Sequence, residues 1–215
     1  MRAVIFDLWD TLVDWPVGEG EELKQRVAEH VGGDPDAFEE AWRASYRASQ
    51  TGPYADVLRS LGVPDEHVGG HVSARHEFGR RFLRLREGAR DAIGELRRRG
   101  VRIGLITVCS EEVPAAWPET ELAGLFDAET FSSECGLVKP EPEIYLRTAE
   151  ALGVDPADCF FVGDGANDEL AGAERVGMTP VLFVPEGREP LWSQVRGWRG
   201  LRAGSMTDVV ALVPG

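Results

Sequence analysis

Short apolar runs alternate with helical segments along most of this chain, and this alternation constrains its fold more than any other feature. The first run is Ala3–Phe6, which ends at Asp7, and a second covers Val101–Thr107. Strands that are apolar at nearly every position are typical of a parallel sheet covered on both faces. Their alternation with helices predicts a doubly wound α/β sheet, whose ligands bind beyond the carboxyl ends of the strands.

The same alternation continues to the end of the sequence. Further strands are expected at residues 128–131, 159–162 and 180–184, and helices at 90–99, 142–152, 169–176 and 206–213. A glycine follows each of the first three helices as a stop signal, at Gly100, Gly153 and Gly177. We therefore predict a core domain formed by residues 1–13 and 87–215.

The segment between Thr11 and about Arg86 departs from this pattern, because it has helical periodicity without buried strands. Helices are expected there at residues 22–31, 35–49, 54–61 and 71–85, separated by glycine and proline. We predict that residues 14–86 form an inserted helical domain.

Charge and cysteine content restrict the partners and the compartment. The formal net charge is −14, which disfavours nucleic acid and anionic membranes as partners because both attract basic surfaces. No apolar run is long enough for a signal-peptide core or a transmembrane helix. The cysteines, odd in number and without metal-type spacing, are expected to be reduced thiols in the core: Cys109, Cys135 and Cys159. A cytoplasmic protein is expected, and its oligomeric state cannot be predicted.

The first predicted strand leads into the string Phe6-Asp7-Leu8-Trp9-Asp10-Thr11-Leu12. This string resembles the first motif of the haloacid dehalogenase (HAD) superfamily, whose strand-end aspartate attacks phosphorus. The resemblance implies that Asp7 is the nucleophile and that Thr11 steadies the loop at the substrate. Such an attack also needs a metal ion, which screens two anions that otherwise repel each other. A turn-capping role for Asp7 would be the better interpretation only if this motif stood alone.

Trp9 departs from the pattern of most HAD phosphatases, which have a second aspartate at this position as general acid and base. An indole cannot transfer protons near neutral pH, so the resemblance leaves this role to another group. Asp10 is one residue late and is expected to point elsewhere. The backbone carbonyl of Trp9 remains available to a metal, since this contact does not depend on the side chain.

Two further motifs supply a hydroxyl and a lysine. Thr107 ends a predicted strand, where the superfamily places a Ser or Thr that donates to a phosphoryl oxygen. Lys139 stands in Gly136-Leu137-Val138-Lys139-Pro140-Glu141-Pro142, which resembles the third motif, whose lysine neutralises the nucleophile and the phosphoryl group. Because the chain has only one other lysine, Lys24, a solvated loop lysine is the weaker interpretation of Lys139. Lys24 is expected at the surface.

The fourth motif is Phe160-Phe161-Val162-Gly163-Asp164-Gly165-Ala166-Asn167-Asp168-Glu169. The resemblance implies that Asp164 binds the metal directly. A second acidic residue follows after four or five positions, so Asp168 and Glu169 both stay open. Mg²⁺ is the expected cofactor, because it prefers oxygen ligands in an octahedron.

The insertion resembles the helical cap that closes over the active site in this superfamily. Arg43 and Arg47, with the aromatic residues Trp42, Tyr46 and Tyr54, form a cluster that could contact an anionic or ring-bearing substrate, although packing within the bundle is the favoured role of the aromatic residues. A second group, His67, His71 and His76, is expected to lie on a solvated helix rather than to bind a metal.

Three functions remain open on the sequence. The resemblance favours a magnesium-dependent hydrolase of a small phosphorylated metabolite that acts through an aspartyl-phosphate on Asp7. A 2-haloacid dehalogenase-like enzyme is the alternative, because those enzymes have an aromatic residue at the position of Trp9, but they usually lack the Gly-Asp pair that contains Asp164. The third possibility is a catalytically weak protein that binds phosphate ligands. The substrate itself cannot be predicted from the sequence.

Overall fold

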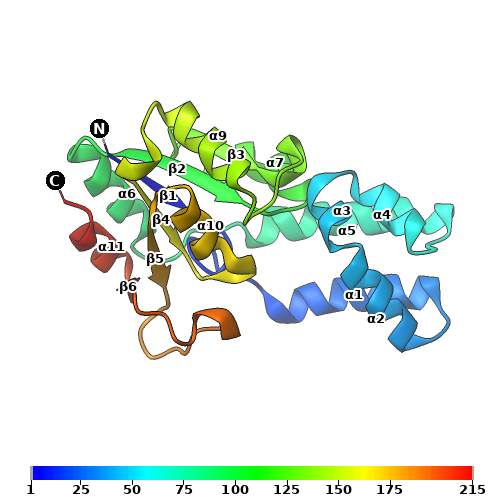
Figure 1. Cartoon of the computed structure of the whole chain (residues 1–215). Coiled ribbons are helices and arrows are strands. Elements are labelled where there is room, and N and C mark those ends of the chain that lie inside the picture. The colour runs from blue at the N-terminus through cyan, green and yellow to red at the C-terminus, as the bar shows by residue number, and fades with distance from the viewer. Residues whose placement is uncertain (1, 215) are drawn as a thin grey trace.

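A six-stranded parallel sheet organises the chain (Figure 1). The computed structural model describes residues 2–214, in which the strand order is β3-β2-β1-β4-β5-β6. The strands are β1 (Ala3–Phe6), β2 (Arg102–Thr107), β3 (Ala128–Phe131), β4 (Cys159–Gly163), β5 (Thr179–Phe183) and β6 (Leu201–Ala203). Every neighbouring pair is parallel, so the doubly wound α/β sheet predicted from the sequence is confirmed.

Helices cover both faces of this sheet, which explains why the strands are apolar throughout. Helices α6 (Ala89–Arg98) and α11 (Met206–Leu212) share one buried cluster with Phe6 of β1. Helices α9 (Pro142–Leu152) and α10 (Glu169–Arg175) share the other with Ile5. Successive residues of the central strand therefore face opposite halves of the core.

A helical insertion extends from the carboxyl end of the sheet, on the right in Figure 1. Its helices are α1 (Val17–Val31), α2 (Pro35–Ala44), α3 (Tyr46–Thr51), α4 (Tyr54–Ser60) and α5 (Asp65–Phe82). They enclose a small apolar core of their own, in which Leu58 is fully buried. The helical character agrees with the sequence analysis, while the limits 14–86 for this domain stay a prediction.

Several elements differ from those expected. The helix expected at 35–49 is divided at Ser45, whose hydroxyl donates to the Trp42 carbonyl (2.8 Å) and competes with helical hydrogen bonding. Helix α5 begins at Asp65 rather than at residue 71, because burial of Val68 in the core of the insertion keeps this first part helical. Strand β6 and the short helices α7 (Glu112–Ala116) and α8 (Ser132–Cys135) were not predicted, since they are too short for a periodic signal.

Arg86 joins the two ends of the insertion. Its side chain donates to the Thr11 carbonyl (2.9 Å) and the Asp10 carbonyl (3.1 Å), and it pairs with Asp14 (2.7 Å). Its backbone N–H donates to the Leu12 carbonyl (2.7 Å). The outgoing and returning chains are thus held together next to the turn that follows β1.

Two of the three cysteines are buried as expected. Cys109 and Cys159 are buried and Cys135 is half-buried, and all three are free. Within residues 2–214, no helix is long and apolar enough to cross a membrane.

Three histidines meet inside the insertion, at the contact of α1 with α5. His71 Nε2 lies 3.0 Å from His30 Nδ1, and the His30 and His67 ring centroids are 4.0 Å apart. The expected solvated helix is wrong for His71, which is buried because α1 packs over it. Burial lowers the pKa of His71, and His30, His67 and Arg26 lower it further because each disfavours another positive charge nearby.

This cluster predicts that the contribution of His71 to stability becomes unfavourable in acid. The unfolded chain protonates His71 near a pKa of about 6.5, whereas the folded chain resists protonation, so stability falls as the pH drops from about 6.5 through the lower folded-state pKa. Urea unfolding should therefore show that the stability of the unsubstituted protein relative to His71→Gln is lower at about pH 5.5 than at about pH 7.5. His76→Gln on the same helix is the control and should keep the pH dependence of the unsubstituted protein. An unchanged pH dependence in His71→Gln would assign the acid sensitivity to other groups.

Candidate active site

The predicted site residues meet at the carboxyl edge of the three central strands. Asp7 follows β1, Thr107 ends β2 and Asp164 follows β4, with β1 lying between the other two strands. The Asp7 N–H donates to the Val162 carbonyl of β4 (2.8 Å), which fixes the nucleophile candidate to the neighbouring strand. The strand order reverses at β1, so the site occupies the switch point where doubly wound sheets bind their ligands.

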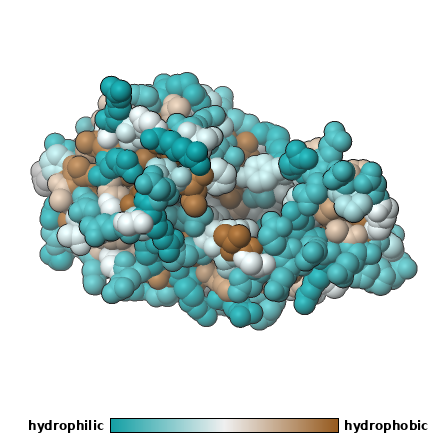
Figure 2. Space-filling view, turned by 90° about the horizontal axis from the view of Figure 1, so that it is seen from below, coloured by the Kyte–Doolittle hydropathy of each residue, from teal (hydrophilic) through white to brown (hydrophobic). Residues whose placement is uncertain are grey.

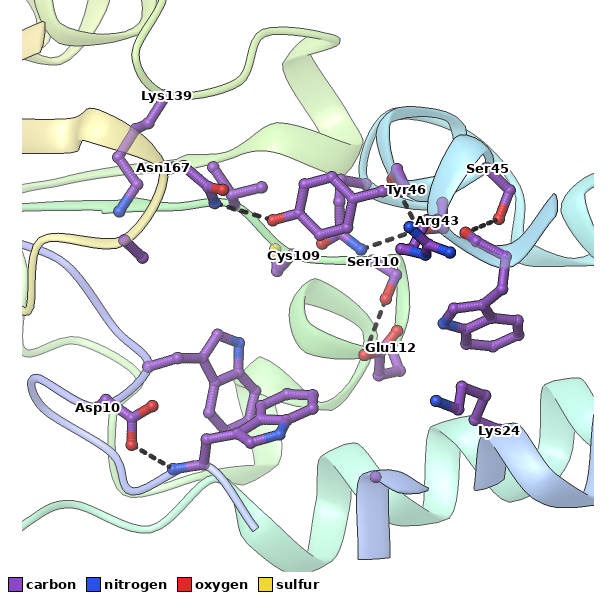
Figure 3. Close-up of a pocket in the computed structure, with 18 of the residues that line it drawn as sticks. Asp10, Lys24, Arg43, Ser45, Tyr46, Cys109, Ser110, Glu112, Lys139 and Asn167 are labelled. Atoms are coloured by element: carbon purple, nitrogen blue, oxygen red, sulfur yellow. Dashed lines mark hydrogen bonds between the residues drawn. The ribbon is translucent and has the colours of Figure 1, made fainter. Parts of the chain in front are cut away.

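Three buried carboxylates converge here. Asp7, Asp164 and Glu169 each have an oxygen within 4.8 Å of the others. Lys139, also buried, donates from Nζ to Asp7 Oδ1 and to Glu169 Oε2. In Figure 3 the Lys139 side chain extends from its loop toward this end of the cavity.

The cluster has more negative than positive charge. If the three acids are ionised, Lys139 leaves two negative charges uncompensated in a buried site. Burial and the neighbouring Asp7 and Asp164 raise the pKa of Glu169 to about 8, and burial raises the pKa of Asp7 despite the adjacent Lys139. Burial alone would lower the pKa of Lys139, but Asp7 and Glu169 raise it, so the lysine stays protonated. A divalent cation with oxygen ligands fits this donor set and its excess charge.

The structure separates the two acids that the sequence left open. Glu169 is the first residue of α10 and is fully buried, and its Oε1 accepts from the Gly165 N–H (2.9 Å). Gly163 makes room for it, because a Cβ at that position would lie 2.1 Å from Glu169 Oε1. Asp168 is exposed in a left-handed conformation (φ 56°) and lies outside the carboxylate cluster.

Two threonine hydroxyls expected at the site are buried and unused. Thr107 Oγ1 and Thr11 Oγ1 have no hydrogen-bond partner among residues 2–214. A buried donor without a partner costs about 1–3 kcal/mol, so an oxygen-bearing ligand beside Thr107 would satisfy it. Thr11 lies in the turn after β1, where Leu12 and Val13 both donate to the Leu8 carbonyl.

Trp9 packs between the core and the insertion. Its ring meets Trp15 edge-on at 4.9 Å and lies 6.5 Å from Phe78 of α5. Asp10 has a left-handed backbone (φ 57°), and its side chain accepts from the Trp15 N–H (3.1 Å). Burial raises the pKa of Asp10, whose side chain lines the cavity described below.

A cavity of about 910 Å³ lies between the sheet edge and the insertion. Figure 2 shows the face on which the surface is hollowed between these two parts. Arg43 lines the cavity, and its contact with a substrate stays a prediction. Lys24 also lines it, where it pairs with Glu21 (2.9 Å) and Glu39 (3.0 Å), so the expected surface position is wrong. The helix that carries Lys24 turns this side chain inward (Figure 3).

Arg47 has a different place from Arg43. It is not among the residues that line the cavity, and its guanidinium pairs with Glu141 beside the loop of Lys139. This arrangement does not support a substrate contact by Arg47. It connects the insertion to the core instead.

Other cavity residues had no role predicted from the sequence. Arg75 of α5 pairs with buried Glu112 (3.0 Å) and donates to Ser110 (3.0 Å), which joins the insertion to the core. Asn167 donates to the Tyr46 hydroxyl (3.0 Å) across the same boundary (Figure 3). The cavity wall is thus formed jointly by both parts of the chain.

Comparison with known proteins identifies the family. The family model described as haloacid dehalogenase-like hydrolase matches residues 1–177. The chain belongs to this family. The resemblance drawn from the sequence is confirmed, and the family makes the chain a hydrolase.

Relatives of this HAD-like hydrolase include enzymes of two kinds. A glyceraldehyde 3-phosphate phosphatase of Pyrococcus abyssi is 30% identical over 85% of this chain and 81% of its own length. An (S)-2-haloacid dehalogenase 4A of Burkholderia cepacia is 25% identical over 88% of this chain and 86% of its own length. Among solved structures, a HAD phosphatase from Thermococcus onnurineus gives a TM-score of 0.71 at 21% identity, covering 100% of this chain and 99% of that one, which shows the shared fold.

Proposed function

We propose that this HAD-like hydrolase is a magnesium-dependent phosphatase that transfers the phosphoryl group of a small phosphorylated metabolite to Asp7 and then to water. The observation that carries the proposal is the buried cluster of Asp7, Asp164 and Glu169 with one lysine. Relatives named as phosphatases support it. The cavity of about 910 Å³ has room for such a metabolite.

The proposed ligands of the cation are the three carboxylates and the backbone carbonyl of Trp9. When bound, Mg²⁺ would screen the repulsion between the Asp7 carboxylate and the phosphoryl oxygens. An Asp7 oxygen forms the new bond to phosphorus while the bond from phosphorus to the leaving oxygen breaks. Water then attacks the phosphorus and the bond from Asp7 to phosphorus breaks, which releases phosphate and restores the Asp7 carboxylate. One proton of this water is released and balances the proton that the leaving oxygen takes up.

Lys139 and Thr107 are proposed to bind the transferring group. A lysine ammonium has three N–H donors, of which Asp7 and Glu169 accept two. The third is available to a phosphoryl oxygen. The buried Thr107 hydroxyl, which has no partner within the described chain, supplies another donor. Both interactions stabilise negative charge as it shifts during transfer.

The principal alternative is a 2-haloacid dehalogenase. Trp9 and the Burkholderia relative favour it, because the resemblance places an aromatic residue at this position in dehalogenases. Halide displacement by Asp7 needs no cation, so the alternative does not account for three converging carboxylates with too little positive charge. We therefore favour phosphate transfer.

The nucleophile is tested by Asp7→Asn, which is nearly isosteric but removes the attacking charge. We expect loss of at least about a thousandfold in turnover of the best substrate from a panel of phosphate esters, phosphonates and haloacids, with a preserved fold by circular dichroism. Unchanged turnover would remove Asp7 from the mechanism. Haloacid turnover in excess chelator would support the dehalogenase instead, and binding of phosphate esters without turnover would support a binding protein.

The metal site is tested by a matched pair of substitutions. Glu169→Gln removes one charge from the buried cluster and should weaken Mg²⁺ binding by more than about tenfold, measured by titration calorimetry without substrate. Asp168→Asn, one residue earlier but exposed, should bind Mg²⁺ like the unsubstituted protein. Weaker Mg²⁺ binding in Asp168→Asn than in Glu169→Gln would make Asp168 the ligand. Thermal unfolding without Mg²⁺ checks that both variants fold.

Trp9 predicts a preference for good leaving groups, since an indole cannot protonate the departing oxygen. Aryl phosphates should be cleaved far faster than alkyl phosphates. Trp9→Asp should reduce this difference between the two turnover rates. Positioned acid catalysis contributes about a hundredfold to ten-thousandfold, so even a partly aligned carboxylate should raise alkyl phosphate turnover measurably.

This test needs a fold check, because Trp9 packs against Trp15 and its removal opens space. If the variant folds and binds Mg²⁺ without a selective gain on alkyl phosphates, Trp9 is not the limitation. Asp10, which lines the cavity, is then the first residue to substitute in search of the acid.

A further inference from the structure

The segment between β5 and β6 folds back onto the chain around Asp164. Trp192 Nε1 donates to Asp164 Oδ2 (2.6 Å), and Gln194 Nε2 donates to the Gly165 carbonyl (3.3 Å). Val195 is buried against Gly165, where a Cβ would lie 2.6 Å from Val195 Cγ1. Gly165 also has a left-handed backbone (φ 91°). Glycine suits this position because it has no Cβ, which permits both this conformation and the close approach of Val195. This segment therefore packs at a defined position on the loop of Asp164.

Both oxygens of Asp164 are fixed by hydrogen bonds. Oδ1 accepts from the Ala166 N–H (3.1 Å) and Oδ2 from the Trp192 indole. Each carboxylate oxygen has two acceptor sites, so these donors hold the carboxylate while leaving one site on each oxygen free. A carboxylate held in this way does not have to be ordered when a cation binds.

The chemistry of the donor matters as much as its position. An indole N–H is neutral and donates a single hydrogen bond, whereas an arginine or lysine at this position would neutralise Asp164. Trp192 thus orients the carboxylate and preserves its negative charge. Trp192 lines the cavity and is 39% exposed as a residue, so it is not held there by burial in the core.

We propose that Trp192 is a positioning residue that presents Asp164 to the cation and thereby sets the affinity of the site for Mg²⁺. The proposal rests on the proposed function, because it assumes that the cluster of Asp7, Asp164 and Glu169 binds Mg²⁺. Hydrogen-bond partners of metal ligands typically change metal affinity by about 10- to 100-fold when they are removed.

The test compares Mg²⁺ affinity by titration calorimetry, without substrate, in the full chain and its variants. Trp192→Phe keeps an aromatic ring but removes the N–H and should weaken binding by about 10- to 100-fold. Trp198→Phe is the matched control, because Trp198 lies in the same segment but donates to the Leu201 carbonyl (2.9 Å), and it should bind Mg²⁺ like the unsubstituted protein. Asp164→Asn should abolish binding.

A second variant separates the hydrogen bond from the shape of the ring. Replacing Trp192 with 3-benzothienylalanine puts a sulfur in place of the N–H in a ring of nearly the same form, and it should weaken binding as Trp192→Phe does. Unchanged or tighter binding in both variants would overturn the positioning role. If the unsubstituted protein binds no Mg²⁺, the proposed metal site is overturned and this role with it, whereas normal binding in both variants leaves the proposed function standing.

Discussion

The contact of Lys139 with Asp7 and Glu169 is the interaction on which the rest of the site depends. These residues come from three distant parts of the chain, and all are buried. A buried ammonium is stable only when carboxylates pair with it, so the loop of Lys139 and the start of α10 must both be fixed relative to β1. The parallel sheet supplies this rigidity, because β1 and β4 are hydrogen-bonded neighbours and Asp7 is tied directly to Val162.

This lysine does not balance the charge of the cluster. Burial, together with the neighbouring carboxylates, raises the pKa of Glu169 and of Asp7. A cation would remove this penalty. The same reasoning explains why a neutral donor, the Trp192 indole, is well suited to hold Asp164: it adds order to the cluster without reducing the charge that attracts a cation.

The insertion and the core build the cavity together. The ion pair of Arg75 with Glu112 and the hydrogen bond of Asn167 to Tyr46 join the two parts at two places along the cavity. Arg86 holds the base of the insertion next to the turn that follows Asp7. Trp9 belongs to that turn and packs on Trp15 and Phe78, so its indole forms part of the contact with the insertion.

The sequence by itself determined the class of fold and the residues at the strand ends. Apolar runs that end in Asp7, Thr107 and Gly163-Asp164 predict parallel strands, and parallel strands bring their carboxyl ends to one edge, so these residues had to lie together. Only the tertiary structure distinguished Glu169 from Asp168. Their side chains point in different directions because α10 begins at Glu169 and Gly163 leaves space for the Glu169 side chain. Only the tertiary structure also brought Lys24 and Trp192 to the cavity, since their positions depend on how α1 and the segment after β5 pack, and no local pattern encodes contacts between such distant segments.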